Sequence, residues 1–182
     1  PFTEPHIASI VKEILQGLDY LHSKLIVHND LKSDNLLLGE DFSIKISDFG
    51  LSKQLKSKDQ TRRRSLGTPY WMAPEQIGKN ANYGLPVDIW SLGIIILEMT
   101  NSGIPPHFSY SPEIALTRIM ALPAPRINSS YSPAFQDFMS HVLVKDPTQR
   151  YSAKQLLQHP FIKKQPVQHP SKFIPQLIDQ AK

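Results

Sequence analysis

Cysteine is absent from the 182 residues, and this absence excludes disulfide bonds, thiolate metal sites and a cysteine nucleophile. It also fits a cytoplasmic protein. A long uncharged apolar run is missing as well. The most apolar stretch, Val87–Met99, contains Asp88, Ser91 and Glu98 and is too short to span a bilayer, so we expect no membrane span. The chain starts at Pro1 without a signal-like stretch, and we expect a fragment or a processed product.

A strong charge of one sign is also lacking, since the formal net charge is +4. The basic run at 62–64 has no aromatic residues interleaved with it, so we expect a solvated loop and no nucleic-acid partner. Hydrophobic residues make up 40% of the chain, which is enough for one globular domain with a buried core.

Apolar residues near the N-terminus recur at helical spacing and predict an amphipathic helix. Thr3 is placed to cap this helix, with Glu4 and Pro5 in its first turn. The apolar positions are Ile7, Ile10, Val11, Ile14, Leu15, Leu18 and Leu21.

Two short apolar runs, 36–38 and 44–46, flank a turn at 39–41 and predict a β-hairpin. The segment between Asp48 and Glu75 is polar and basic with little periodicity, and we expect a long mobile loop there.

From Pro86 onward the pattern is helical, with proline-rich joints between the helices. The expected helices are 87–100, 112–120, 132–144 and 152–158, and Ser152 opens the last one as a capping box. The first of these is apolar on nearly every face, which predicts a buried helix. We expect a mainly α fold, a helical bundle with a small β-hairpin that carries the functional loops. The domain is expected to span 1–161, with a tail at 162–182 packed on it or trailing from it.

The segment 28–35 reads His-Asn-Asp-Leu-Lys-Ser-Asp-Asn. Phosphoryl transfer from ATP needs a carboxylate to orient the acceptor hydroxyl, a cation near the phosphoryl group and oxygen ligands for Mg²⁺. Asp30 is the candidate base, and Lys32 is the candidate cation. Asn35 and Asp48 are candidate Mg²⁺ ligands, and we expect them to meet because a hairpin brings the ends of its two strands together.

Three further segments follow in order, Asp48-Phe49-Gly50, 67–75 and 88–93. Together with 28–35 they resemble the signatures of the C-terminal lobe of a eukaryotic protein kinase. This resemblance covers nearly the whole chain. Lys32 together with Thr68 is similar to the serine/threonine class. The segments 31–35, 67–75 and 156–161 are most similar to the PAK-like branch of the Sterile-20 group.

The resemblance implies ATP-dependent phosphorylation of serine or threonine on protein substrates in intracellular signalling, with ATP and Mg²⁺ as cofactors. It implies catalytic roles for Asp30, Lys32, Asn35 and Thr68. It implies nucleotide contacts for Lys32, Asn35, Leu37 and Asp48. It implies that Asp34 and Glu98 hold basic residues of the substrate upstream of the phosphorylated position. It implies structural roles for His28, Phe49, Asp88 and an ion pair of Glu75 with Arg150. A small GTPase is an implied partner, through a region outside this chain.

The sequence departs from the family pattern in two places. Position 29 is Asn where the family has Arg, which weakens a switch based on loop phosphorylation. Ser65 and then Thr61 are the candidate phosphorylation sites, with 62–64 as a source of replacement cations. We expect activity to depend little on phosphorylated Ser65. The family's N-terminal lobe, with its Gly-rich loop and anchoring Lys, is absent from the sequence, so we expect the chain alone to bind ATP poorly and to be inactive.

Two other functions remain open at this stage. A pseudokinase or scaffold would use the fold for binding only, and Asn29 favours it, although Asp30, Lys32, Asn35 and Asp48 are all present. A small-molecule phosphotransferase of kinase-like fold would share the catalytic loop, but we do not expect it to carry a long segment ending in Ala-Pro-Glu.

Overall fold

The computed structural model describes residues 2–58, 60–63, 65–164 and 169–180. It is mainly α, as the sequence predicts. The α-helices are α1 (Glu4–Ser23), α2 (Pro86–Thr100), α3 (Pro112–Ala121), α4 (Pro133–Val142), α5 (Ala153–Leu156), α6 (Pro160–Lys163) and α7 (Ile174–Gln180). The strands are β1 (Ile26–Val27), β2 (Leu36–Leu38), β3 (Ile44–Ile46) and β4 (Lys53–Gln54). Short 3₁₀ turns are η1 (Ser33–Asn35), η2 (Pro69–Trp71), η3 (Pro74–Gln76) and η4 (Pro170–Lys172).

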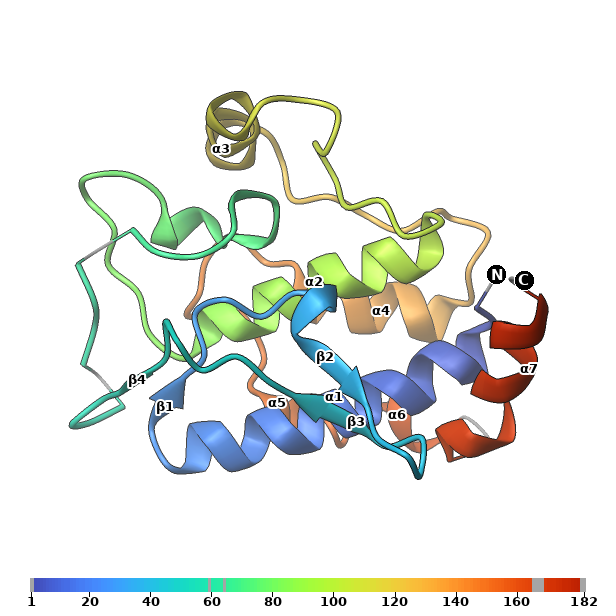
Figure 1. The fold of residues 1–182 in the computed structure, drawn as a ribbon. Helices are drawn as coiled ribbons and strands as arrows, with labels where there is room; N and C mark the ends of the chain where they lie inside the picture. The colour runs from blue at the N-terminus through green and yellow to red at the C-terminus, as the bar shows by residue number, and fades with distance from the viewer. Residues whose placement is uncertain (1, 59, 64, 165–168, 181–182) are drawn as a thin grey trace.

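Helix α1 forms where the apolar period predicts it. Thr3 is at the N-cap, and its backbone N–H donates to Nδ1 of His6 at 3.4 Å. The apolar side chains at positions 7, 11, 14 and 18 are fully buried, because 3.6 residues per turn bring them to one face. This face packs against α2, α5 and α6 and forms the base of the core (Figure 1).

Helix α2 lies inside the domain, and every residue from Val87 to Glu98 is buried. The prediction that this helix, apolar on nearly every face, is buried is confirmed. A Cβ atom at Gly93 would lie 2.6 Å from Cδ2 of Leu143, which is closer than real side chains approach. Glycine therefore allows the segment after α4 to pack directly on the backbone of α2, at the cost of helix propensity.

The predicted hairpin is confirmed. Strands β2 and β3 are antiparallel, with Leu36 opposite Ile46 and Leu38 opposite Ile44, and β3 contacts α1 (Figure 1). The prediction of a long mobile loop between Asp48 and Glu75 was wrong in that the segment is not entirely irregular. This segment contains β4, η2 and η3, and β4 pairs with β1.

Helix α4 spans Pro133–Val142 instead of 132–144 and α5 spans Ala153–Leu156 instead of 152–158, while α2 and α3 each differ from the prediction by one residue at one end. Helix α4 begins at Pro133, because Ser132 is its N-cap and accepts from Phe135 N. Helix α5 ends at Leu156 instead of 158, although its predicted capping box at Ser152 is present. The reason is Pro160, which disfavours helical geometry at His159 and starts α6 instead.

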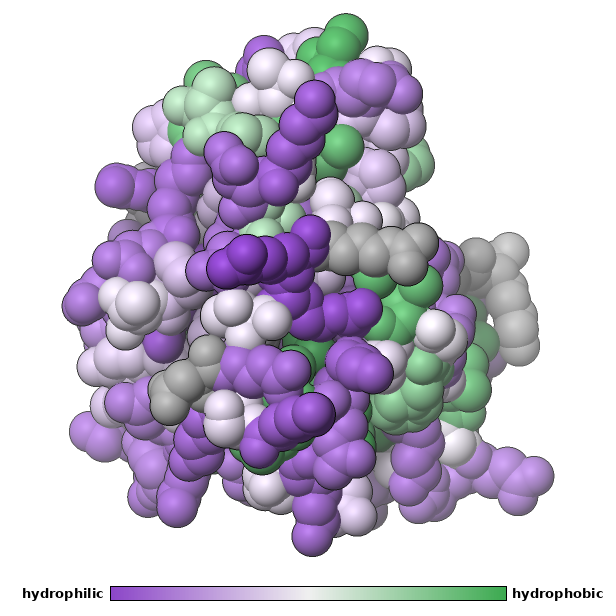
Figure 2. Space-filling model, turned by 90° about the vertical axis from the view of Figure 1, so that its left-hand side faces the viewer, coloured by the Kyte–Doolittle hydropathy of each residue, from purple (hydrophilic) through white to green (hydrophobic). Residues whose placement is uncertain are grey.

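The chain after α6 contacts α1. Phe173 is 4% exposed and its ring stacks on His6 at 4.3 Å. Within the described ranges, no helix combines the length and the apolar character needed to cross a membrane. The face that carries β4 is mostly hydrophilic, with apolar areas at the top of the molecule, where α3 lies, and at the right of the view (Figure 2).

Candidate functional site

Three of the four residues with predicted catalytic roles, Asp30, Lys32 and Thr68, form one hydrogen-bonded cluster. Oδ1 of Asp30 accepts from the backbone N–H of Thr68 at 2.8 Å and from its Oγ1 at 2.6 Å. Nζ of Lys32 donates to Thr68 Oγ1 at 3.2 Å and lies 3.9 Å from Asp30 Oδ2. Both side chains are partly exposed, Lys32 at 22% and Asp30 at 13%. A carboxylate, a hydroxyl and an ammonium group thus converge at an accessible point.

The backbone before this cluster is anchored to α2 by Asp88, which is 1% exposed. Its carboxylate accepts from the backbone N–H groups of His28 at 2.9 Å and Asn29 at 3.0 Å. A third contact is 2.9 Å from Asp88 Oδ2 to Nε2 of His22. The sequence analysis missed His22, because one histidine at the end of an amphipathic helix gives no periodic signal. Two helices therefore hold one end of the catalytic loop.

His28 is fully buried, and its contacts settle its tautomer. Nδ1 accepts from the backbone N–H of Asp30 at 3.3 Å, so Nε2 carries the proton and donates to the carbonyl of Ser47 at 2.9 Å. The ring of Phe49 packs edge-on against His28 at 5.2 Å and is itself 48% exposed. His28 thus connects the catalytic loop with the segment that carries Asp48.

Asn35 and Asp48 lie at corresponding ends of the hairpin strands. The register places Asn35 beside Ser47, whose N–H and Oγ both donate to the Asn35 carbonyl. Nδ2 of Asn35 donates to the carbonyl of Asp30 at 2.8 Å, and this bond does not involve the amide oxygen. Asp48 is exposed and its Oδ1 accepts from Gly50 N at 3.2 Å. One carboxylate and one amide oxygen fit Mg²⁺, which takes few protein ligands and completes its shell with phosphate and water.

Glu98 on α2 is 6% exposed. Its Oε2 accepts from Nε1 of Trp71 at 2.7 Å and its Oε1 from Oγ of Ser33 at 2.9 Å. Burial raises the pKa of the Glu98 carboxyl, these two hydrogen bonds act against the rise, and the negative charge of Asp34 adds to it. Asp34 is exposed on η1. The structure therefore brings Asp34 and Glu98 near each other, and Glu98 already has partners within the chain.

Glu75 and Arg150 form a buried bidentate ion pair. Nη1 of Arg150 donates to Glu75 Oε1 at 2.6 Å, and Nη2 donates to Oε2 at 3.2 Å. The remaining N–H groups of the guanidinium donate to the carbonyls of Val144 and Pro86. The pair joins the end of the segment 48–75 to the chain after α4.

The remaining predicted residues are on the surface. Thr61 and Ser65 are exposed, and Leu37 is 54% exposed on β2. Of the basic run, Arg62 is not simply solvated, because its backbone pairs with Tyr83 and its Nη1 donates to the carbonyl of Leu51 at 3.3 Å. Position 64 lies outside the described residues.

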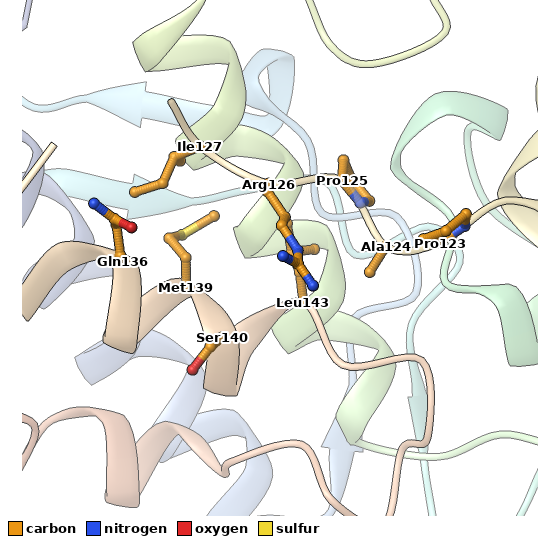
Figure 3. A pocket seen from close by; sticks show the side chains of 9 residues that line it. All are labelled: Pro123, Ala124, Pro125, Arg126, Ile127, Gln136, Met139, Ser140 and Leu143. Atoms are coloured by element: carbon orange, nitrogen blue, oxygen red, sulfur yellow. The ribbon is translucent and has the colours of Figure 1, made fainter. Parts of the chain in front are cut away.

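Two other features lie away from this cluster. Asp137, His141 and His159 could hold a metal by distance alone. However, His159 Nδ1 accepts from Phe161 N, whereas a metal-bound histidine donates from its second nitrogen. A cavity of about 420 Å³ lies between the linker 123–127 and α4 (Figure 3), and its lining includes none of the predicted site residues.

Comparisons with known proteins agree with this arrangement. The model of the protein kinase domain matches residues 1–162. The serine/threonine-protein kinase ste20 of Emericella nidulans is 46% identical over 88% of this chain and 19% of its own length. The serine/threonine-protein kinase PAK mbt of Drosophila melanogaster is 44% identical over 88% of this chain and 25% of its own length. The serine/threonine-protein kinase sid1 of Schizosaccharomyces pombe is 45% identical over 88% of this chain and 34% of its own length.

The chain thus spans between a fifth and about a third of the length of these curated relatives. Within that span, the family match, the sequence identities and the order of the motifs all indicate a protein kinase domain. The chain belongs to the protein kinase domain family and is similar to the serine/threonine kinases of the Ste20 and PAK type.

Proposed function

We propose that the complete protein that carries this chain transfers phosphate from ATP to serine or threonine on protein substrates. The observation that carries the proposal is the cluster of Asp30, Lys32 and Thr68. The Thr68 contacts fix one oxygen of Asp30, so the other oxygen is the one that orients an acceptor hydroxyl. Lys32 lies on that side, 3.9 Å from Oδ2, where its charge favours an incoming phosphate group.

The proposal assigns Mg²⁺ to Asn35 and Asp48 and the adenine of ATP to the exposed surface at Leu37. When bound, Mg-ATP supplies the phosphoryl group that is transferred. The residues of the chain orient the acceptor and keep a cation near the transferred group. Leu37 is 54% exposed on β2, and an exposed apolar side chain favours contact with a flat aromatic base.

We also propose that substrates carry basic residues upstream of the phosphorylated residue, which Asp34 and Glu98 bind. Glu98 and Ser33 line a cavity of about 710 Å³ whose other walls are mostly apolar. A carboxylate has room for about four hydrogen bonds, and the chain supplies Glu98 with two. A guanidinium can therefore bind there with its aliphatic part against the apolar walls.

The test is a phosphate-transfer assay on the complete protein with a serine peptide that has arginine upstream. Asp30→Asn should abolish transfer, while Asp41→Asn, in the exposed hairpin turn, should leave it unchanged. Replacing the peptide arginine with alanine should raise KM in the wild type and have less effect in Glu98→Gln. Full activity of Asp30→Asn would refute the catalytic assignment, and an equal KM for both peptides would refute the substrate preference.

The proposal further includes a kinase C-lobe at 1–161 with a tail at 162–182, a cytoplasmic location, and a small GTPase as a partner of another part of the complete protein. The GTPase partner is proposed because the chain is similar to PAK-type kinases, among them PAK mbt of Drosophila melanogaster.

A further inference from the structure

Asn29 lies between the catalytic loop and the segment 48–75 and is 3% exposed. Its φ of +71° is left-handed, a conformation that asparagine tolerates better than most residues. Its backbone N–H donates to Asp88, and its carbonyl accepts from Nε2 of Gln76 at 3.5 Å. A Cβ at Gly67 would lie 2.9 Å from the same carbonyl. The backbone of Asn29 is thus fixed without any contribution from its side chain.

The side chain makes a separate contact. Nδ2 of Asn29 donates to the carbonyl of Leu51 at 2.7 Å, three residues after Asp48. Oδ1 is buried and has no hydrogen-bond partner in the described part of the chain. If the amide were turned over, Oδ1 would face the Leu51 carbonyl and Nδ2 would lose its acceptor. Leaving Oδ1 buried and unpaired costs about 1–3 kcal/mol. The amide can therefore contribute to the structure only through the hydrogen bond that Nδ2 donates.

This bond is one of two fixed ends around Asp48. On one side, the carbonyl of Ser47 accepts from His28 Nε2 at 2.9 Å. On the other side, the carbonyl of Leu51 accepts from Asn29. The exposed residues 48–50 therefore form a short arch between Ser47 and Leu51, and both ends are bound to the two residues that precede Asp30.

We propose that Asn29 is a positioning residue for phosphate transfer. Its amide holds Leu51 against the catalytic loop and so fixes the metal ligand Asp48 relative to the base Asp30, without a phosphate group on the segment 48–75. This inference rests on the proposed function. Arg62 assists through its own bond to the Leu51 carbonyl, but this contact is longer and more exposed.

The test compares wild type, Asn29→Gly and Asn29→Asp in the complete protein. Glycine adopts a φ of +71° without strain and removes the amide. Aspartate keeps the shape and replaces the donor with an oxygen that repels the Leu51 carbonyl. Asn101→Gly is the matched control, because Asn101 Nδ2 also donates to a backbone carbonyl, that of Ile104 at 3.0 Å, on an exposed loop.

The readouts are the Mg²⁺ concentration for half-maximal activity and ATP binding with Mg²⁺ or with EDTA. Because a lost buried hydrogen bond shifts an equilibrium by about tenfold, both Asn29 variants should need about tenfold more Mg²⁺. Their ATP affinity in EDTA should equal that of wild type, and the tightening by Mg²⁺ should be reduced. A residue that only supported the fold would lower the melting temperature and the activity at every Mg²⁺ concentration.

The outcomes separate this inference from the proposed function. If wild type is active and a folded Asn29 variant keeps the wild-type Mg²⁺ dependence, the inference is wrong and the proposed function stands. If wild type transfers no phosphate, the proposed function fails, and the Mg²⁺-dependent part of ATP binding still decides the role of Asn29. If Asn29→Gly does not fold, Asn29→Asp decides by the same two readouts.

Discussion

The buried ion pair of Arg150 offers a quantitative test of how the lobe is held together. The five N–H groups of its guanidinium make five hydrogen bonds, two of them to Glu75 and three to backbone carbonyls. The side chain of Arg150 is 0% exposed and that of Glu75 is 11% exposed. Arg150→Lys keeps the positive charge and offers only three N–H groups from one nitrogen.

Arg150→Lys loses two charge-assisted hydrogen bonds worth about 1.5 kcal/mol each, so its free energy of unfolding should fall by about 3 kcal/mol. Urea unfolding measures it, with tryptophan fluorescence as the signal because the guanidinium carbon lies 5.3 Å from the ring centroid of Trp90. With a slope of about 2 kcal/mol per molar, the midpoint should fall by about 1.5 M. In the complete protein, activity should persist at temperatures at which the variant stays folded, because the partners of Arg150 are Glu75, Val144 and Pro86 and not the catalytic cluster.

The control is Arg118→Lys. The Arg118 guanidinium donates to His107 Nδ1 at 3.3 Å and lies 4.5 Å from the centroid of the Tyr110 ring, and the residue is partly exposed. This variant should lose less than about 1 kcal/mol. A loss of less than about 1 kcal/mol in the free energy of unfolding of Arg150→Lys as well would refute the reasoning. The planar guanidinium with its five N–H groups would then stabilise the fold no more than the single ammonium group of lysine does.

Three further predictions concern the site and its supports. Asp88→Asn should lower the free energy of unfolding by about 3 kcal/mol and speed amide hydrogen exchange at positions 28 and 29. The exposed control Asp137→Asn should do neither, and equal effects of the two variants would contradict the anchoring role of Asp88. Because the pKa of Glu98 is raised in the folded state, its contribution to stability is present below the unfolded pKa and is lost as pH rises through the folded pKa. In urea unfolding, the free energy of unfolding of Glu98→Gln relative to wild type should therefore be higher at pH 7 than at pH 4. The same difference at both pH values would show that folding does not disfavour the ionised carboxylate. Ser65→Ala in the complete protein should keep its transfer rate within about twofold, and a collapse of the rate would show that Ser65 phosphorylation is needed.

Sequence periodicity predicted the parts of the fold in which one element has a clear apolar face. Helix α1 and the hairpin were predicted for this reason, and the bounds of α2 agree within one residue. Strand β4 was missed because Lys53 and Gln54 are both exposed, and the apolar signal is limited to Leu55, which is 4% exposed. A two-residue strand is determined by its partner β1, and a pairing between distant segments leaves no local pattern.

In the candidate site, the sequence pointed to the residues with expected chemical roles but not to the residues that support them. Chemistry requires particular groups, so Asp30, Lys32, Asn35 and Asp48 could be named from residue type and order. The supporting contacts of His22 and Trp71 could not be named, since a histidine and an indole serve many purposes and only their proximity to Asp88 and Glu98 gives them a role.

Asn29 shows why a departure from a family pattern needs the structure for its interpretation. From the sequence, Asn in place of Arg is the loss of a cation that would bind phosphate. In the folded chain, Nδ2 of Asn29 donates to the Leu51 carbonyl at 2.7 Å, whereas a long charged side chain would have to leave this buried place to reach solvent. Under the proposal for Asn29, the chain therefore has a contact that is present without phosphorylation where the family resemblance implies one that depends on it. This difference is the physical reason to expect that Ser65 phosphorylation contributes little to the activity of the complete protein.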